Sequence, residues 1–172
     1  TAKQRTATLW ADAGYVVAEE KLPVQKAQKP LYTPATATPL TVEEGTTIIT
    51  VSNDRMKATF SKSQGTLSTY LFNDVKLMSK PLLLNTFRLP TDNDGRQCEG
   101  WDNAGLRKLT VKGKGAEVQR ADDGQTVTVT LASTHTGLNG TAFDVKMHFV
   151  VCADGTIITN ALVHPAVSGA TS

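Results

Sequence analysis

Apolar and polar residues alternate along the chain from about residue 46 onward. Met56, Ala58 and Phe60 are separated by polar or small residues, the period of two that places successive side chains on opposite faces of a strand. The same alternation recurs over residues 126–131 and 145–151. Three further stretches have β-type composition: "TTIITVS", "TLSTYLF" and "TIITNALV". We therefore expect a succession of strands.

Turn-forming residues fall between these strands. They are Gly65, Asn73-Asp74, Asp123-Gly124 and Asp154-Gly155, residue types that favour tight hairpin connections. Short strands joined by tight turns, without a long helical period, predict an all-β fold built as an antiparallel β-sandwich. One helical turn is expected in "GWDNAGLRKL", after Gly100.

The N-terminal part differs from this pattern. Tyr15–Val17 favour a strand after a turn at Gly14, and one strand cannot bury its own face. Because the chain does not begin with Met, we expect a piece of a longer protein. The expected organisation is the end of one domain over residues 1–24, a proline-rich linker over 25–45, and the first part of the sandwich domain over 46–172.

Composition narrows the function classes. The 18 basic and 16 acidic residues give a net charge of +2, which supplies no electrostatic basis for binding nucleic acid or an anionic membrane. No apolar run is long enough to cross a bilayer. Cys98 and Cys152 do not form a CxxC pattern, which argues against a zinc site; they can form a disulfide, but two buried or incidental thiols are the favoured interpretation. The three histidines lack metal-ligand spacing, and we interpret them as structural. Nothing decides between a cytoplasmic and a periplasmic location.

The segment "NTFRLPTDNDGRQCEGWDNAGL", residues 85–106, concentrates polar and turn-forming residues. In a strand, Asp92 and Asp94 would share a face roughly 6.5–7 Å apart, a separation that suits the paired carboxylates of an inverting glycosidase. Alternatively, Asp-Asn-Asp-Gly is a turn whose side chains hydrogen-bond their own backbone. The local sequence favours the turn. An EF-hand is excluded, because Trp101 stands where the calcium loop needs a glutamate.

Two neighbouring side chains each have two interpretations. Arg88 can clamp Asp92 or Asp94 in a bidentate ion pair, or form a surface salt bridge of little energetic value. Trp101 can stack on a sugar ring, or it can fill the core beside its loop, which is the more common role of such a residue.

The stretch "FRLPTDNDGRQCEGWDNAGL" resembles a run near the start of the last domain of large bacterial β-galactosidases of glycoside hydrolase family 2. The family pattern is Arg-x-Pro-x-Asp-Asn-Asp, a variable loop, then Trp-x-x-Ala-Gly. "WADAGYVVAEEKLPV" is similar to the end of the family's preceding immunoglobulin-like domain. "MKATFSKSQGTLSTYLFNDVKLM" is similar to the opening hairpins of its last domain.

This resemblance implies a layout. The chain would hold the last strand of an immunoglobulin-like domain, a linker, and the first part of a galactose-mutarotase-like β super-sandwich. The two catalytic glutamates of the family lie in a (β/α)8 barrel that this chain lacks, so the fragment alone would be inactive. The parent enzyme would hydrolyse terminal β-D-galactosides with retention and would use Mg²⁺ and Na⁺, mainly through barrel residues. The fragment would need no cofactor.

The resemblance also assigns roles. Asp92, Asn93, Asp94 and Gly95 would form a turn beside the barrel's active-site mouth, with Arg88 pinning it and Gly95 acting as a hinge. Only six residues separate Asp94 from Trp101, which is short for the family. The expected partners are the barrel, a β-galactoside and further copies of the parent, but neither nucleic acid nor a membrane. Two alternatives stay open: a freestanding carbohydrate-binding module using Trp101 and the Asp loop, and a purely structural sandwich.

Overall fold

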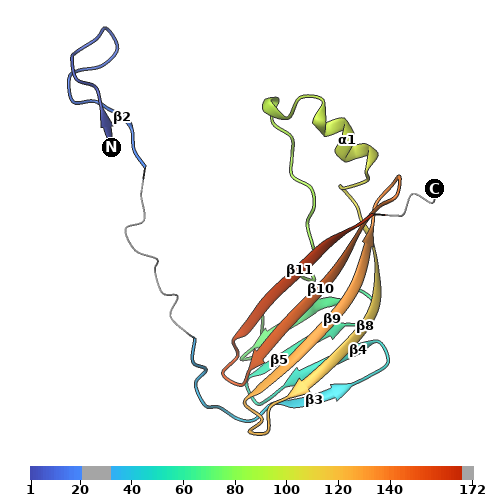
Figure 1. Ribbon diagram of the computed structural model, residues 1–172. Helices are drawn as coiled ribbons and strands as arrows, with labels where there is room; N and C mark the ends of the chain where they lie inside the picture. The colour runs from blue at the N-terminus through green and yellow to red at the C-terminus, as the bar shows by residue number, and fades with distance from the viewer. Residues whose placement is uncertain (21–31, 168–172) are drawn as a thin grey trace. The chain divides into compact units, whose positions relative to one another are not determined.

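The computed structural model describes residues 1–20 and 32–167 (Figure 1). The chain divides into two compact units, residues 1–33 and 34–172. In the first unit, β1 (Ala2–Lys3) pairs antiparallel with β2 (Val16–Ala18). The strand expected near Tyr15 therefore does not stand alone, because it has a partner within the same unit. Trp10 packs edge-on against Tyr15, with ring centroids 5.6 Å apart.

The second unit is a sandwich of two antiparallel sheets, which confirms the predicted fold class. One sheet has the order β3-β4-β5-β6-β7, with bounds Thr41–Glu44, Ile48–Ser52, Met56–Ser61, Thr66–Phe72 and Val75–Lys76. The other has the order β11-β10-β9-β8, with bounds Ile157–Val167, Thr141–Cys152, Thr126–Thr136 and Thr110–Arg120. Neighbouring strands are consecutive in the chain, so the sheets are simple meanders.

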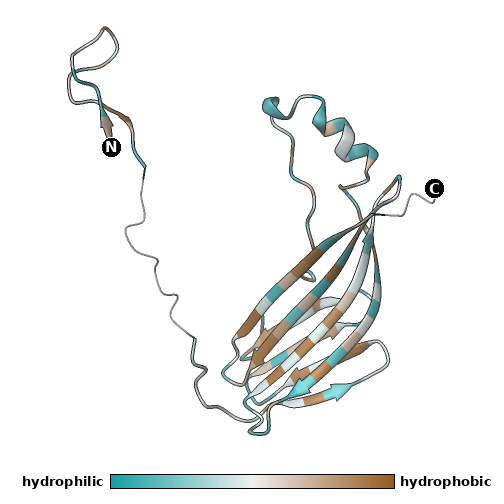
Figure 2. Ribbon diagram, in the orientation of Figure 1, coloured by the Kyte–Doolittle hydropathy of each residue, from teal (hydrophilic) through white to brown (hydrophobic). Residues whose placement is uncertain are grey.

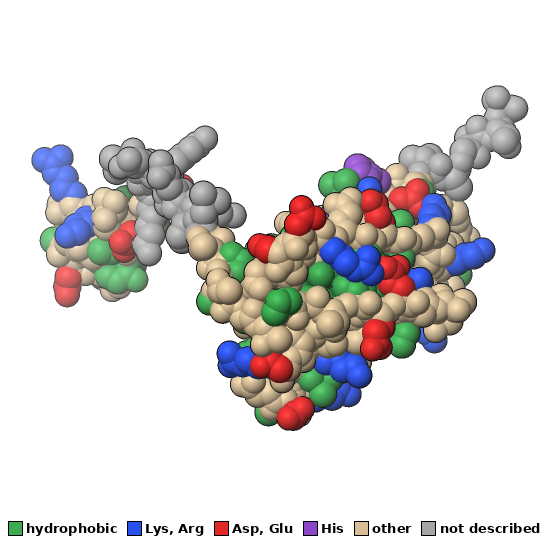
Figure 3. Space-filling view, turned by 90° about the horizontal axis from the view of Figure 1, so that it is seen from below, with side chains coloured by type: hydrophobic (Ala, Val, Ile, Leu, Met, Phe, Trp, Pro, Cys, Tyr) green, Lys and Arg blue, Asp and Glu red, His purple; other side chains and the backbone are tan. Residues whose placement is uncertain are grey.

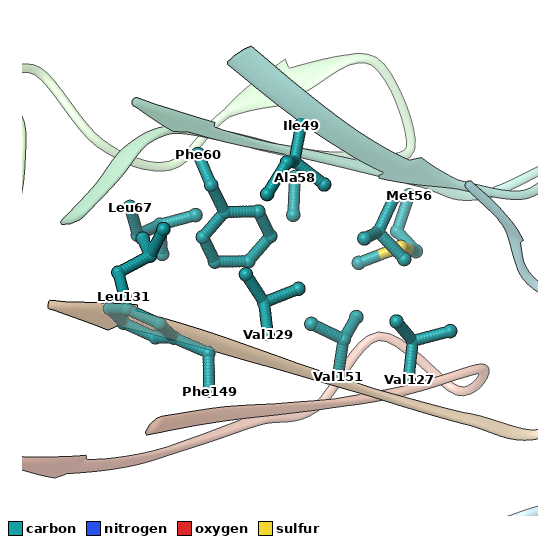
Figure 4. Packing of buried hydrophobic residues seen from close by; sticks show 11 residues of the cluster. Ile49, Met56, Ala58, Phe60, Leu67, Val127, Val129, Leu131, Phe149 and Val151 are labelled. Carbon is teal, nitrogen blue, oxygen red and sulfur yellow. The ribbon is translucent and has the colours of Figure 1, made fainter. Parts of the chain in front are cut away.

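The core lies between the two sheets, as the alternating pattern requires. On β9, Val127, Val129 and Leu131 are buried while the intervening threonines are only partly covered. Figure 2 shows the resulting alternation of hydrophobic and hydrophilic residues along the strands. The rings of Phe60 and Phe149 meet across the two sheets with centroids 5.1 Å apart (Figure 4). A shift of one residue in register would turn these side chains to solvent.

Charged side chains cover the outside without forming a field of one sign. Figure 3 shows acidic and basic groups interspersed over the face in view, consistent with the net charge of +2. In the described part of the chain the longest helix has seven residues, and none is long and apolar enough to cross a membrane.

The region expected to form a linker, 25–45, has several parts. Residues 21–31 lie outside the described residues. Residues 35–40 contact the end of the sandwich through hydrogen bonds, and Thr41–Glu44 form β3, which pairs with β4. The alternation in "TVEE" is too short to identify this strand from sequence, since pairing with β4 is what defines it.

Candidate functional site

The polar segment singled out from sequence lies in the long connection between β7 and β8, residues 77–109, hereafter the β7–β8 connection (Figure 1). It contains the 3-10 turn η1 (Asp92–Asp94) and the helix α1 (Gln97–Asn103). The sequence predicts a helical turn after Gly100, whereas α1 begins at Gln97, three residues earlier. Backbone and side-chain bonds fasten this connection to the β9–β10 turn: Leu138 N–H donates to Ala104 O at 2.8 Å, and Asn139 Nδ2 donates to Asn103 O at 2.8 Å.

The Asp-Asn-Asp segment is a turn and not a strand. Thr91 precedes η1 with extended backbone, and Asp94 N–H donates to Thr91 O at 2.9 Å. In return, Asp94 Oδ2 accepts from Thr91 N–H at 2.5 Å and from Thr91 Oγ1 at 3.0 Å. This reciprocal arrangement is a capping box. The strand in which Asp92 and Asp94 would share one face is therefore not formed.

Arg88 makes the bidentate ion pair, and its partner is Asp94. Nη1 donates to Oδ2 at 2.8 Å and Nη2 donates to Oδ1 at 2.6 Å. Asp94 is 9% exposed. Hydrogen bonds from Arg88, and then from the Thr91 backbone, hold the pKa of the Asp94 carboxyl well below its usual range. Asp94 is thus a permanent carboxylate at neutral pH, with both oxygens occupied, and cannot serve as a general acid.

Asp92 and Asn93 have the opposite environment. Both are exposed, and within the described residues neither side chain has a hydrogen bond or ion pair. Gly95, which follows them, has φ +48, and a Cβ there would meet nothing within 4 Å. Its left-handed φ, rather than crowding, is what favours glycine at this position. The turn therefore presents Asp92 and Asn93 to solvent on a fixed backbone.

Two arginines flank a pair of aromatic rings beside the turn. Arg88 lies over the Trp101 ring, 5.2 Å from its centroid, and Phe87 meets Trp101 edge-on at 6.3 Å. Arg107 lies 4.4 Å over Phe87 and is paired in turn with Asp102. We call Arg107, Phe87, Trp101 and Arg88 the Arg–aromatic column. Trp101 thus packs against its own loop.

Phe87 and Arg107 were missed by sequence reasoning. They lie 20 positions apart in the chain and meet where the two ends of the connection lie together, next to the hydrogen bond that Thr86 Oγ1 donates to Leu106 O at 3.0 Å. No local spacing signals such a contact. The one signal in the sequence that points to the Phe87–Arg107 contact is an aromatic residue directly before Arg88.

An open pocket of about 470 Å³ lies beside the column, lined by Asn85, Thr86, Phe87, Arg88, Trp101 and Leu106. This volume falls within the range of small-molecule sites. Among residues 1–20 and 32–167 no group of three or more His, Cys, Asp or Glu side chains could hold a metal ion. The chemistry offered is hydrogen bonding and aromatic contact from a preformed polar loop.

Comparison with known proteins assigns the chain to a family. The model of the family described as "Beta galactosidase small chain" matches residues 52–170. The chain belongs to this family. The matched region includes the capping box, α1 and all four strands of the β8–β11 sheet, and the finding confirms the resemblance noted from the sequence.

Two curated relatives are β-galactosidases. One, from Priestia megaterium (strain DSM 319 / IMG 1521), is 32% identical over 116 residues, covering 61% of this chain and 11% of the relative. The other, from Streptococcus thermophilus, is 29% identical over 157 residues, covering 91% of this chain and 15% of the relative. The chain therefore spans only a small part of the length of each relative.

Proposed function

We propose that this chain is a non-catalytic C-terminal segment of a β-galactosidase of glycoside hydrolase family 2, and that its β7–β8 connection shapes the mouth of the parent's active site. The parent would hydrolyse terminal β-D-galactosides with retention. Family membership and the two β-galactosidase relatives support the enzyme class. The small share of each relative that is covered supports a segment whose chemistry is completed by other parts of the protein.

One observation carries the role of the loop. Arg88 and Thr91 satisfy the Asp94 carboxylate completely, so the turn is preorganised and Asp92 and Asn93 keep their hydrogen-bonding capacity for a partner. Polar loops held by a rigid scaffold are where binding functions concentrate. In this division of roles, Asp94 positions the turn, whereas Asp92 and Asn93 contact the neighbouring barrel or the galactoside.

The same geometry supports a role that breaks no bonds. A retaining glycosidase needs two carboxyl groups, one nucleophilic and one able to exchange a proton. Asp94 is held as a paired carboxylate, which leaves Asp92 alone on the turn. The catalytic glutamates would come from the barrel, where Mg²⁺ and Na⁺ would also bind, and this segment would be inactive by itself. Oligomerisation is expected of the parent enzyme.

The test uses the intact β-galactosidase that contains this region. We expect Asp92→Ala and Asp94→Ala each to lower kcat/KM on a nitrophenyl β-galactoside by roughly tenfold or more, the range seen when positioning contacts are lost. The matched control is Asp144→Ala, because Asp144 is also an ion-paired aspartate (with Lys114, Nζ–Oδ1 2.7 Å) but lies on the outer face of the sandwich. Unchanged KM and kcat in both loop variants would refute the proposal.

A freestanding carbohydrate-binding module is the other candidate. The pocket beside Trp101 has a suitable size, but Arg88 lies over the Trp101 ring and Phe87 meets it edge-on. Titration of this chain with galactose, followed by Trp fluorescence and calorimetry, separates the two functions. We expect no saturable binding. Saturation that Trp101→Leu abolishes would instead favour the module.

A further inference from the structure

Three turns at one end of the sandwich together hold an extended stretch of the chain. The turns are β4–β5 around Asn53, β8–β9 around Gln125, and β10–β11 around Asp154. They face residues 35–40, which enter the sandwich just before β3 (Figure 1). This end lies opposite the β9–β10 turn that carries the β7–β8 connection.

Gln125 makes the most specific of these contacts. Its Oε1 accepts from Ala37 N–H at 3.0 Å, and its Nε2 donates to Ala37 O at 2.9 Å. The side-chain amide thus binds both backbone groups of one residue, as the peptide groups of a neighbouring antiparallel strand would. Gln125 has no other side-chain hydrogen bond within the described residues, so its amide is devoted to this segment.

The other two side chains extend the pattern in both directions. Asp154 Oδ2 accepts from Ala35 N–H at 3.0 Å, and its Oδ1 accepts from Thr156 N–H at 3.0 Å. Asn53 Nδ2 donates to Thr38 O and to Ala153 O, both at 2.8 Å. Each side chain therefore binds the segment and a turn of the sandwich at once.

A backbone contact completes the set. Leu40 N–H donates to Gly124 O at 2.8 Å, and Leu40 packs against the hydrophobic core. The bonded amides are those of Ala35, Ala37 and Leu40, whereas within the described residues the amides of Thr36 and Thr38 have no hydrogen-bond partner. Ala35 and Ala37 are two positions apart, the spacing of residues on one face of an extended strand, and Leu40 follows three positions later, after Pro39.

We propose that Asn53, Gln125 and Asp154 form a docking site for an extended peptide backbone, and that its occupant is the chain's own segment Ala35–Leu40. The site makes this segment part of the sandwich, which thus begins at Ala35 and not at β3. This inference is independent of the galactosidase proposal.

Because the three side chains bind backbone groups of the segment, we expect the docking to tolerate changes of side chain within residues 35–38. The hydrogen bonds to residues 35–38 from the described part of the sandwich are made with N–H or C=O groups. A side-chain change such as Ala37→Ser should therefore leave the docking intact. Loss of the Gln125 amide should open it at Ala37.

Amide hydrogen exchange, measured by NMR on the full chain, tests the proposal. We expect the amides of Ala35, Ala37 and Leu40 to exchange at least roughly tenfold more slowly than those of Thr36 and Thr38. In Gln125→Leu, exchange at Ala37 should rise to the rate of Thr36 while the core amide of Val129 stays protected. Protection of Val129 shows that the variant is folded.

Two variants are matched controls. Gln119→Leu removes an exposed glutamine whose side-chain amide, within the described residues, hydrogen-bonds Glu117 and not the docked segment; it should leave exchange at Ala37 unchanged. Ala37→Ser should also keep the slow exchange. The proposal is overturned if Ala37 exchanges as fast as Thr36 in the unmodified chain, or if Gln125→Leu leaves the Ala37 rate unaltered.

Discussion

The sandwich core around Phe60 and the β7–β8 connection around Asp94 belong to the same unit but are stabilised differently. Phe60 is fully buried and contacts apolar side chains from both sheets. Asp94 is nearly buried too, yet its neighbours are a guanidinium, a backbone N–H and a hydroxyl. Apolar burial is non-directional, whereas charge-assisted hydrogen bonds impose geometry. The core thus supplies stability, and the connection supplies a defined shape.

Because the core and the connection are stabilised differently, mutations in them should have different effects. Removing core volume should lower the free energy of unfolding of the whole unit. Removing a directional contact in the connection should release the loop while the sheets remain. Variants can therefore be ordered by how far their effect spreads.

The largest effect is expected from Phe60→Ala. This change removes a fully buried ring that packs on Phe149, and such truncations cost about 3–5 kcal/mol. Urea unfolding followed by far-UV circular dichroism should show the loss. A change below about 1 kcal/mol would mean that the two sheets do not depend on this contact.

An intermediate effect is expected from Gly113→Ala. A Cβ at Gly113 would lie 1.9 Å from the carbonyl oxygen of Lys62, so the β8 backbone must move away from the β5–β6 turn. Overpacking of this kind costs about 1–3 kcal/mol, measurable by the same unfolding experiment. Gly115→Ala is the control, since a Cβ there meets nothing within 4 Å. Equal effects of the two variants would contradict the crowding argument.

Asp94→Asn should act on the connection alone. An amide cannot replace the carboxylate as a bidentate acceptor for Arg88 and as acceptor for Thr91 N–H. We expect faster hydrogen exchange of the Thr91 amide with little change in the unfolding midpoint of the sandwich. Asp92→Asn, at an exposed position of the same turn, should alter neither quantity. A large drop in the midpoint for Asp94→Asn would show that the connection and core are one cooperative unit.

The pH dependence of the Asp94 ion pair is expected to be the smallest effect. The folded-state pKa of Asp94 is lowered, chiefly by the hydrogen bond from Arg88, so its stabilising contribution is complete above the ordinary Asp pKa of about 4. That contribution is lost as the pH falls from there towards the lowered pKa. The pKa of Asp102 is also lowered, chiefly by the hydrogen bond from Arg107, but this side chain is half-exposed. Carboxyl carbon NMR should show Asp94 titrating at a lower pH than Asp102.

The core strands of the sandwich could be predicted from the sequence more completely than strand β8. The core strands were predictable because alternation of side chains is a local property, as in Met56, Ala58 and Phe60. Strand β8 was not identified, because Gly113 and Gly115 interrupt its pattern and its register shifts at that point. At the same point the backbone of Lys62, which is distant in sequence, lies too close to Gly113 for a Cβ.

The candidate site shows the same limit. The turn and the Arg88 ion pair were among the interpretations open from sequence, since the contacting residues are six positions apart. The choice of Asp94 over Asp92 needed the capping box with Thr91. The Arg107–Phe87 contact joins the two ends of a long connection, and tertiary structure alone brings them together.

The arrangement of these contacts also bears on how the loop can diversify. In the described residues the Asp94 carboxylate bonds to Arg88 and Thr91, Cys98 Sγ donates to Gly95 O at 3.0 Å, and the next member of the Arg–aromatic column along the chain is Trp101. The six residues between Asp94 and Trp101 contribute to neither the carboxylate bonds nor the column, and Gly95 opens onto free space. Insertions placed after Gly95 can therefore change the reach of the loop while the turn keeps its shape, which makes this junction a natural point for grafting new sequence.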